Sequence, residues 1–155
     1  MFYRDGAAIH RLRHLYVSWF SQLERLFEHL VDTADSEVIL SLINETLYEL
    51  WHSSCAGASS GALNEWILRC AVKQAQRFVR QQPASLPVDG RGHTMLSPLP
   101  VEERAVIYLT YSGHSRVQVA SIVRLACEEV DRLLARARAR LRDRAISSPD
   151  CNVTV

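Results

Sequence analysis

The first half of the chain alternates between stretches of helical hydrophobic periodicity and short polar breaks. Apolar residues recur at three- and four-residue steps over residues 8–29, from about residue 36 to 51, and over residues 62–82, which predicts three amphipathic helices. Residues 32–35 are polar, and residues 53–61 are rich in Ser, Ala and Gly, so we predict breaks at both places.

The second half repeats this pattern with shorter elements. Residues 99–142 predict three helices, and Gly113 separates the first from the second. Ser115 and Gln118 have the spacing of a capping box, which starts the second helix. The third helix is the longest, and its apolar stripe is Val130, Leu133, Leu134, Ala137 and Leu141. A short helix, a turn and a longer helix form the helix-turn-helix pattern, whose last helix enters the major groove of DNA.

A segment with no periodicity separates the two halves. It contains three prolines and two glycines between residues 81 and 98, which predicts an irregular, stiffened linker. We therefore predict an all-α chain with two small helical domains at residues 8–82 and 99–144. The linker is residues 83–98, and residues 145–155 form a flexible tail.

Positive charge is concentrated in the second domain. The whole chain has a formal net charge of +1, so any nucleic-acid binding depends on a local patch. Residues 99–144 contain nine arginines and six acidic residues, whereas the remainder contains nine basic and eleven acidic residues. Arginine suits both phosphate and guanine edges. Charge alone does not separate a DNA-binding face from an ordinary solvated one.

The second domain resembles region 4 of bacterial sigma factors, above all the small extracytoplasmic-function group. The residues that carry the resemblance are Leu99-Pro100, Glu103-Arg104, Val106-Ile107, Leu109, Gly113-His114-Ser115, Val119-Ala120, Val130, Arg136-Ala137-Arg138 and Leu141-Arg142. The family often has glycine in the turn where Arg124-Leu125 stand. The resemblance implies that this domain reads the upstream promoter element and contacts the flap of the polymerase beta subunit.

The first domain resembles region 2 of the same family in a divergent form. The run from Ser41 to Trp51 is similar to the family segment that binds the polymerase beta-prime coiled coil, and Trp66-Ile67 is similar to the start of the helix that binds the downstream promoter element. Ser41 stands where the family usually has an acidic residue, and Asn44 where it has glutamine.

The resemblance implies three groups of site residues and no catalytic residue. The polymerase-binding group is Ser41, Asn44 and Glu45. The downstream DNA-binding group is Arg69, Lys73, Arg77 and Arg80. The upstream DNA-binding group is Arg116, Arg132, Arg136, Arg138 and Arg140. The implied partners are core RNA polymerase, promoter DNA and an anti-sigma factor.

Other function classes lack their motifs in this sequence. We find no phosphate-binding loop, nucleophile elbow or clear pair of carboxylates, so we expect neither catalysis nor a cofactor. Four scattered cysteines form no C-x-x-C pair, and the pair His52 and Cys55 lacks further ligands, so we expect reduced thiols and no metal. The absence of a signal peptide or of an apolar run near 20 residues predicts a cytoplasmic protein.

Two other functions remain compatible with the sequence. One is a sigma-like decoy that binds an anti-sigma factor by imitating regions 2 and 4. The other is a helix-turn-helix transcription regulator whose first domain serves dimerisation or sensing, and a stable dimer would favour it because such regulators read two half-sites.

Overall fold

The computed structural model describes residues 5–53, 60–82 and 94–147, and within them every regular element is an α-helix. The six helices are α1 (Asp5–Val31), α2 (Ser36–His52), α3 (Ser60–Gln81), α4 (Val101–Tyr111), α5 (Arg116–Val123) and α6 (Cys127–Ser147). The predicted all-α class is confirmed, and each predicted helix lies within a few residues of an observed one.

Local sequence signals explain where several helices begin. The Asp35 carboxylate accepts hydrogen bonds from the backbone N–H groups of Glu37 and Val38 and so caps α2. The predicted capping box of α5 is present: the Gln118 N–H donates to the Ser115 hydroxyl, and the Ser115 N–H donates to the Gln118 side chain. Gly113, at the break before α5, has a φ of 94°.

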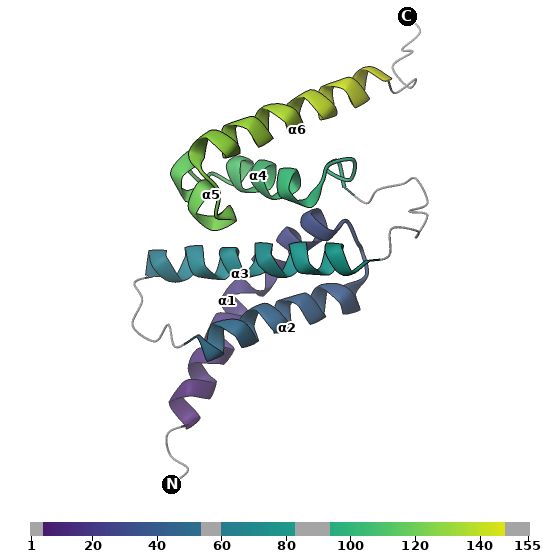
Figure 1. Cartoon of the computed structure of the whole chain (residues 1–155). Coiled ribbons are helices and arrows are strands. Elements are labelled where there is room, and N and C mark those ends of the chain that lie inside the picture. Colours follow the sequence, from purple (N-terminus) through teal and green to yellow (C-terminus); the bar gives the residue numbers. More distant parts are fainter. Residues whose placement is uncertain (1–4, 54–59, 83–93, 148–155) are drawn as a thin grey trace, which may run out of the picture.

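Helix α3 lies at the centre of the molecule (Figure 1). It packs against α1 and α2 on one side and against α4 and α5 on the other, and α6 covers the far side of α4. Seven of the nine residues from Ile67 to Ala75 are buried, which is more than a one-sided amphipathic helix would bury. One apolar core therefore runs through both halves of the chain, from Leu23 and Phe27 of α1 to Val119 of α5.

A turn before α4 adds to the contact between the halves. Residues 83–93 lie outside the described residues, so the domain boundary there stays a prediction. The described end of the predicted linker, residues 94–98, forms a turn in which Leu96 is buried and packs in a small cluster with Leu99 and Ile107. The Thr94 N–H and the Ser97 hydroxyl both donate to the Asp32 carboxylate, which attaches the turn to the end of α1.

Arg104 binds three backbone carbonyls from both halves of the chain. Its guanidinium donates to the carbonyl of Leu30 at 2.9 Å, to that of Leu96 at 3.2 Å and to that of Ser97 at 2.9 Å. Burial lowers the pKa of Arg104 from its usual value, while the nearby Asp32 carboxylate acts in the opposite direction. Arg104 thus stabilises the junction of α1, the turn and α4.

We predict that Arg104→Ala lowers the free energy of unfolding by roughly 3 kcal/mol, because three half-buried carbonyls lose a charged donor. Arg142→Ala is the matched control, since Arg142 is exposed on α6, and we expect a change below ~0.5 kcal/mol there. Urea denaturation of both variants measures the difference. Equal stabilities of the two variants would contradict this role of Arg104.

Arg124 ends α5 in the left-handed conformation, with a φ of 58° and a ψ of 44°. Arg124 is one of the two residues, Arg124-Leu125, that stand in the turn where sigma region 4 often has glycine. A residue with a Cβ atom is strained there, whereas glycine is not.

We therefore predict that Arg124→Gly raises the free energy of unfolding by about 0.5–1 kcal/mol. Arg132→Gly inside α6 should lower it by about 1 kcal/mol, because glycine is a poor helix former. Thermal unfolding of the two variants tests the opposite signs. A lower melting temperature of Arg124→Gly would refute the expected relief of strain.

Candidate nucleic-acid interface

Helices α4, α5 and α6 pack in the predicted helix-turn-helix order (Figure 1). Helix α6 buries Val130, Leu133 and Ala137, and α4 packs against it. The remaining faces of α6 carry four of the five arginines predicted to bind the upstream element, and the fifth, Arg116, begins α5. All six arginines of α6 are exposed.

Acidic side chains accompany two of these arginines near the start of α6. Arg116, at the start of α5, forms an ion pair with Asp131, and Arg132 forms one with Glu129 at 3.0 Å. All four side chains are exposed by about a third or more, so these pairs add little stability. They do reduce the positive potential at the first turn of α6.

Farther along α6, the arginines have different surroundings. The guanidinium of Arg138 lies 5.9 Å from the centre of the Tyr111 ring, within the range of a cation–π contact. Arg136 and Arg140 each lie 3.7 Å from the carboxylate of Glu103, which is buried in α4. On α6, the positive charge that has no acidic partner among the described residues therefore lies at Arg138 and in the part of the helix after Arg140.

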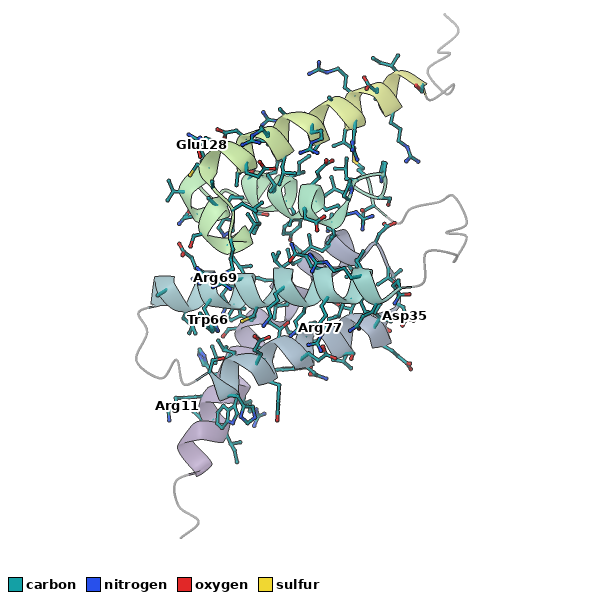
Figure 2. The ribbon with its side chains drawn as sticks, in the orientation of Figure 1. Arg11, Asp35, Trp66, Arg69, Arg77 and Glu128 are labelled. Carbon is teal, nitrogen blue, oxygen red and sulfur yellow. The ribbon has the colours of Figure 1, made fainter. Side chains whose placement is uncertain are left out.

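The second predicted DNA-binding group lies on one face of α3, but its side chains have different partners. Arg69 donates to the carbonyl oxygen of Ser121 at 3.2 Å and to its hydroxyl at 2.9 Å, so it belongs to the contact between α3 and α5 (Figure 2). The Ser121 hydroxyl in turn donates to Glu65 at 3.2 Å. Lys73 forms an ion pair with Glu49 of α2 at 2.7 Å. Arg80 is exposed.

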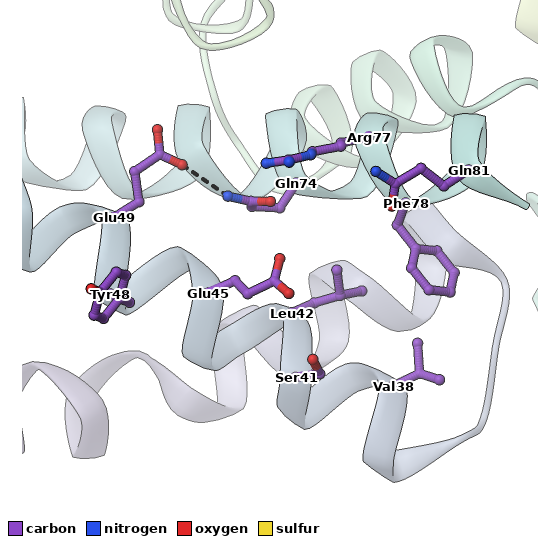
Figure 3. A pocket seen from close by; sticks show the side chains of 10 residues that line it. All are labelled: Val38, Ser41, Leu42, Glu45, Tyr48, Glu49, Gln74, Arg77, Phe78 and Gln81. Carbon is purple, nitrogen blue, oxygen red and sulfur yellow. Dashed lines mark hydrogen bonds between the residues drawn. The ribbon is translucent and has the colours of Figure 1, made fainter.

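A groove of 420 Å³ lies between α2 and α3 (Figure 3). Its lining residues are Val38, Ser41, Leu42, Glu45, Tyr48, Glu49, Gln74, Arg77, Phe78 and Gln81. The groove brings together Ser41 and Glu45, predicted to bind polymerase, and Arg77, predicted to bind DNA. Asn44 is exposed on α2 but does not line the groove.

The upper part of the groove contains an incompletely satisfied polar group. Gln74 is buried, and its amide nitrogen donates to Glu49 at 2.8 Å (Figure 3). Its amide oxygen is buried and accepts no hydrogen bond from the described residues. Glu49 thus joins Lys73 and Gln74 of α3 to α2.

Comparison of structures identifies the fold. CnrH, an extracytoplasmic-function sigma factor solved in complex with the cytosolic domain of CnrY, matches 88% of this chain and 88% of its own chain, with a TM-score of 0.69 and 18% sequence identity. The chain therefore shares the fold of CnrH over this length. No protein-family model matches the sequence, and no curated protein matches it.

Two other features, a metal-binding cluster and a membrane-spanning helix, were searched for in the described residues. No group of three or more His, Cys, Asp or Glu side chains in residues 5–53, 60–82 and 94–147 is arranged to hold a metal ion. The pair of His52 and Cys55 cannot be followed, because Cys55 lies outside these ranges. None of the helices described has both the length and the apolar character of a membrane span.

Several residues that organise these surfaces were not among the predicted site residues. Glu49, Gln74 and Ser121 act through contacts between residues at least 24 positions apart, which periodicity does not reveal. Glu103 did carry a signal: it precedes Val106 by three residues and Ile107 by four, so it lies on the apolar face of α4. A carboxylate at such a position requires positive partners.

We predict that Glu49→Ala lowers the free energy of unfolding by about 1–2 kcal/mol, because it leaves the buried Gln74 amide without its acceptor. Lys73→Ala, which removes the other partner of Glu49, should cost at most about 0.5 kcal/mol, because the Lys73 side chain is 62% exposed. Urea denaturation compares the two, and equal losses would assign the effect of Glu49 to the ion pair instead.

Proposed function

We propose that this chain is an alternative sigma factor of the extracytoplasmic-function type. It would bind core RNA polymerase and direct it to promoters, by binding and strand opening and without covalent chemistry. The fold shared with CnrH over 88% of both chains carries the proposal. The chemistry of α6 supports it, because an exposed arginine-rich helix at the end of a helix-turn-helix suits the major groove and its phosphates.

The groove between α2 and α3 supports the proposed contact with polymerase. It exposes the carboxylate of Glu45 next to an apolar end formed by Val38 and Phe78. An amphipathic helix with basic side chains, such as a strand of a coiled coil, has the matching chemistry. We also propose an anti-sigma partner, because CnrH was solved with the cytosolic domain of CnrY. The proposed site of action is the cytoplasm, where polymerase operates.

The proposed DNA role of Arg69 requires a rearrangement. Its guanidinium is bound to Ser121 of α5. Promoter DNA can reach it only when α5 moves away from α3. We therefore propose that the arrangement of Figure 1 is a state of the free chain in which the two DNA-binding surfaces are not both available.

A decoy for an anti-sigma factor is the second candidate. Arg69 and Lys73 bind other residues of the chain, which favours the decoy, because a decoy does not need these side chains for DNA. The exposed arginines of α6 favour the sigma factor, because a decoy does not need to keep side chains that contact DNA.

Run-off transcription with sigma-free core polymerase of the source bacterium on its fragmented genomic DNA tests the proposal. A sigma factor should produce discrete transcripts that are absent without the chain. Binding to core polymerase without any transcript would refute the proposed strand opening. Failure to bind core at all would refute the sigma-factor function and favour the decoy.

For promoters found in this way, we predict that Arg138→Ala weakens promoter binding by ~1–3 kcal/mol if the side chain contacts a base. Arg13→Ala is the control, since Arg13 is exposed on α1 and outside the proposed surfaces. Electrophoretic mobility shift with the polymerase complex measures both. Unchanged affinity and unchanged salt dependence in Arg138→Ala would exclude Arg138 from the DNA contact.

A further inference from the structure

Glu103 is the one charged side chain among the described residues that is almost completely buried. The residue is 2% exposed and lies in the first turn of α4, where its carboxylate faces α6. A buried carboxylate is costly unless positive charge compensates it. The nearest compensating charges are Arg136 and Arg140, two of the arginines assigned to DNA.

The contacts of Glu103 with these arginines are electrostatic rather than hydrogen bonds. The Arg136 Nε lies 3.7 Å from Oε1, and the Arg140 Nη1 lies 3.7 Å from Oε2. Oε2 has no hydrogen-bond partner among the described residues. The charge of Glu103 is therefore balanced by two guanidinium groups that are near it but not tightly bound to it.

Both arginines stay accessible while they are held. Their side chains are 52% and 47% exposed, and they stand four residues apart, about 6 Å along the helix axis. Arg136 directs its Nε toward Glu103, so its two terminal nitrogens make no ion pair in the described part of the chain. Each guanidinium can donate to a group outside the protein without leaving Glu103.

We propose that Glu103 is a positioning residue that orders Arg136 and Arg140 for contact with DNA phosphates. This inference rests on the DNA-binding function proposed above. Its carboxylate holds Arg136 and Arg140 side by side on α6 before DNA arrives. Ordering a long side chain on binding has an entropic cost, and a pre-ordered arginine avoids part of it. The deep burial of Glu103 keeps its own charge away from the phosphates, which approach from the solvent.

The experiment compares Glu103→Gln with Glu102→Gln in the full chain. Both substitutions remove one negative charge from adjacent positions of α4, but Glu102 makes no ion pair in the described residues. The probe is a fluorescently labelled DNA duplex of random sequence, because phosphate contacts are independent of sequence. We expect Glu103→Gln to bind about tenfold more weakly than Glu102→Gln.

A background that lacks both arginines separates positioning from a general structural effect. In Arg136→Ala/Arg140→Ala, the further change Glu103→Gln should leave the remaining affinity unchanged, because the groups through which it acts are gone. Glu103→Asp keeps the charge but retracts it by one methylene, and it should give an intermediate loss. This variant serves as the test if thermal unfolding shows that Glu103→Gln is not folded.

Three results would overturn the positioning role of Glu103 alone. Equal affinity of Glu103→Gln and Glu102→Gln would show that the arginines need no positioning. Tighter binding by Glu103→Gln would show that Glu103 masks them instead. The same loss in the background without the arginines would make its role structural. A wild-type chain that binds no duplex would refute the proposed DNA-binding function, and this inference with it, whereas the three results above leave that function standing.

Discussion

The structure depends on the burial of α3 from two sides. Its central residues pack on α1 and α2 and, at the same time, on α4 and α5. Such a helix cannot expose one whole face to DNA: from residue 65 to residue 79 only Lys73 and Arg77 are exposed, and Arg80 follows them in the last turn. The DNA contacts proposed for α3 must therefore use these exposed side chains or form after α5 has moved.

The charges of the second half are arranged in pairs of different depth. Asp131 and Glu129 neutralise Arg116 and Arg132 at the surface, where water screens the pairs. From within the protein, Glu103 lies beside Arg136 and Arg140 and offsets one of their two positive charges. The formal excess of positive charge is thus not spread evenly, and it is strongest toward the second half of α6. This distribution explains how a chain with a net charge of +1 can present a strongly basic helix.

The sequence predicted those features that depend on neighbours along the chain. The six helices follow from periodicity, and the capping box follows from Ser115 and Gln118, since helix spacing and caps are local. It did not predict the burial of Leu96, because proline and glycine around it indicate a linker, nor the binding of Arg69 by Ser121. The contact of Arg69 with Ser121 joins residues that are 52 positions apart. Leu96 lies in a segment whose composition is typical of a linker, although it packs in a hydrophobic cluster. The individual DNA-binding and polymerase-binding residues stay predictions.

The groove between α2 and α3 limits how the predicted residues can be shared between partners. Ser41 and Glu45 were assigned to polymerase and Arg77 to DNA, yet all three line one groove. A protein helix seated on Glu45 would cover Arg77, and a nucleic-acid strand on Arg77 would meet the carboxylates of Glu45 and Glu49. The negative phosphates and these carboxylates would repel each other, so a nucleic-acid strand would gain little binding free energy there. The groove as a whole is therefore better suited to a protein partner, and the DNA contacts proposed for α3 would have to come from Lys73 and Arg80 and, after α5 has moved, from Arg69.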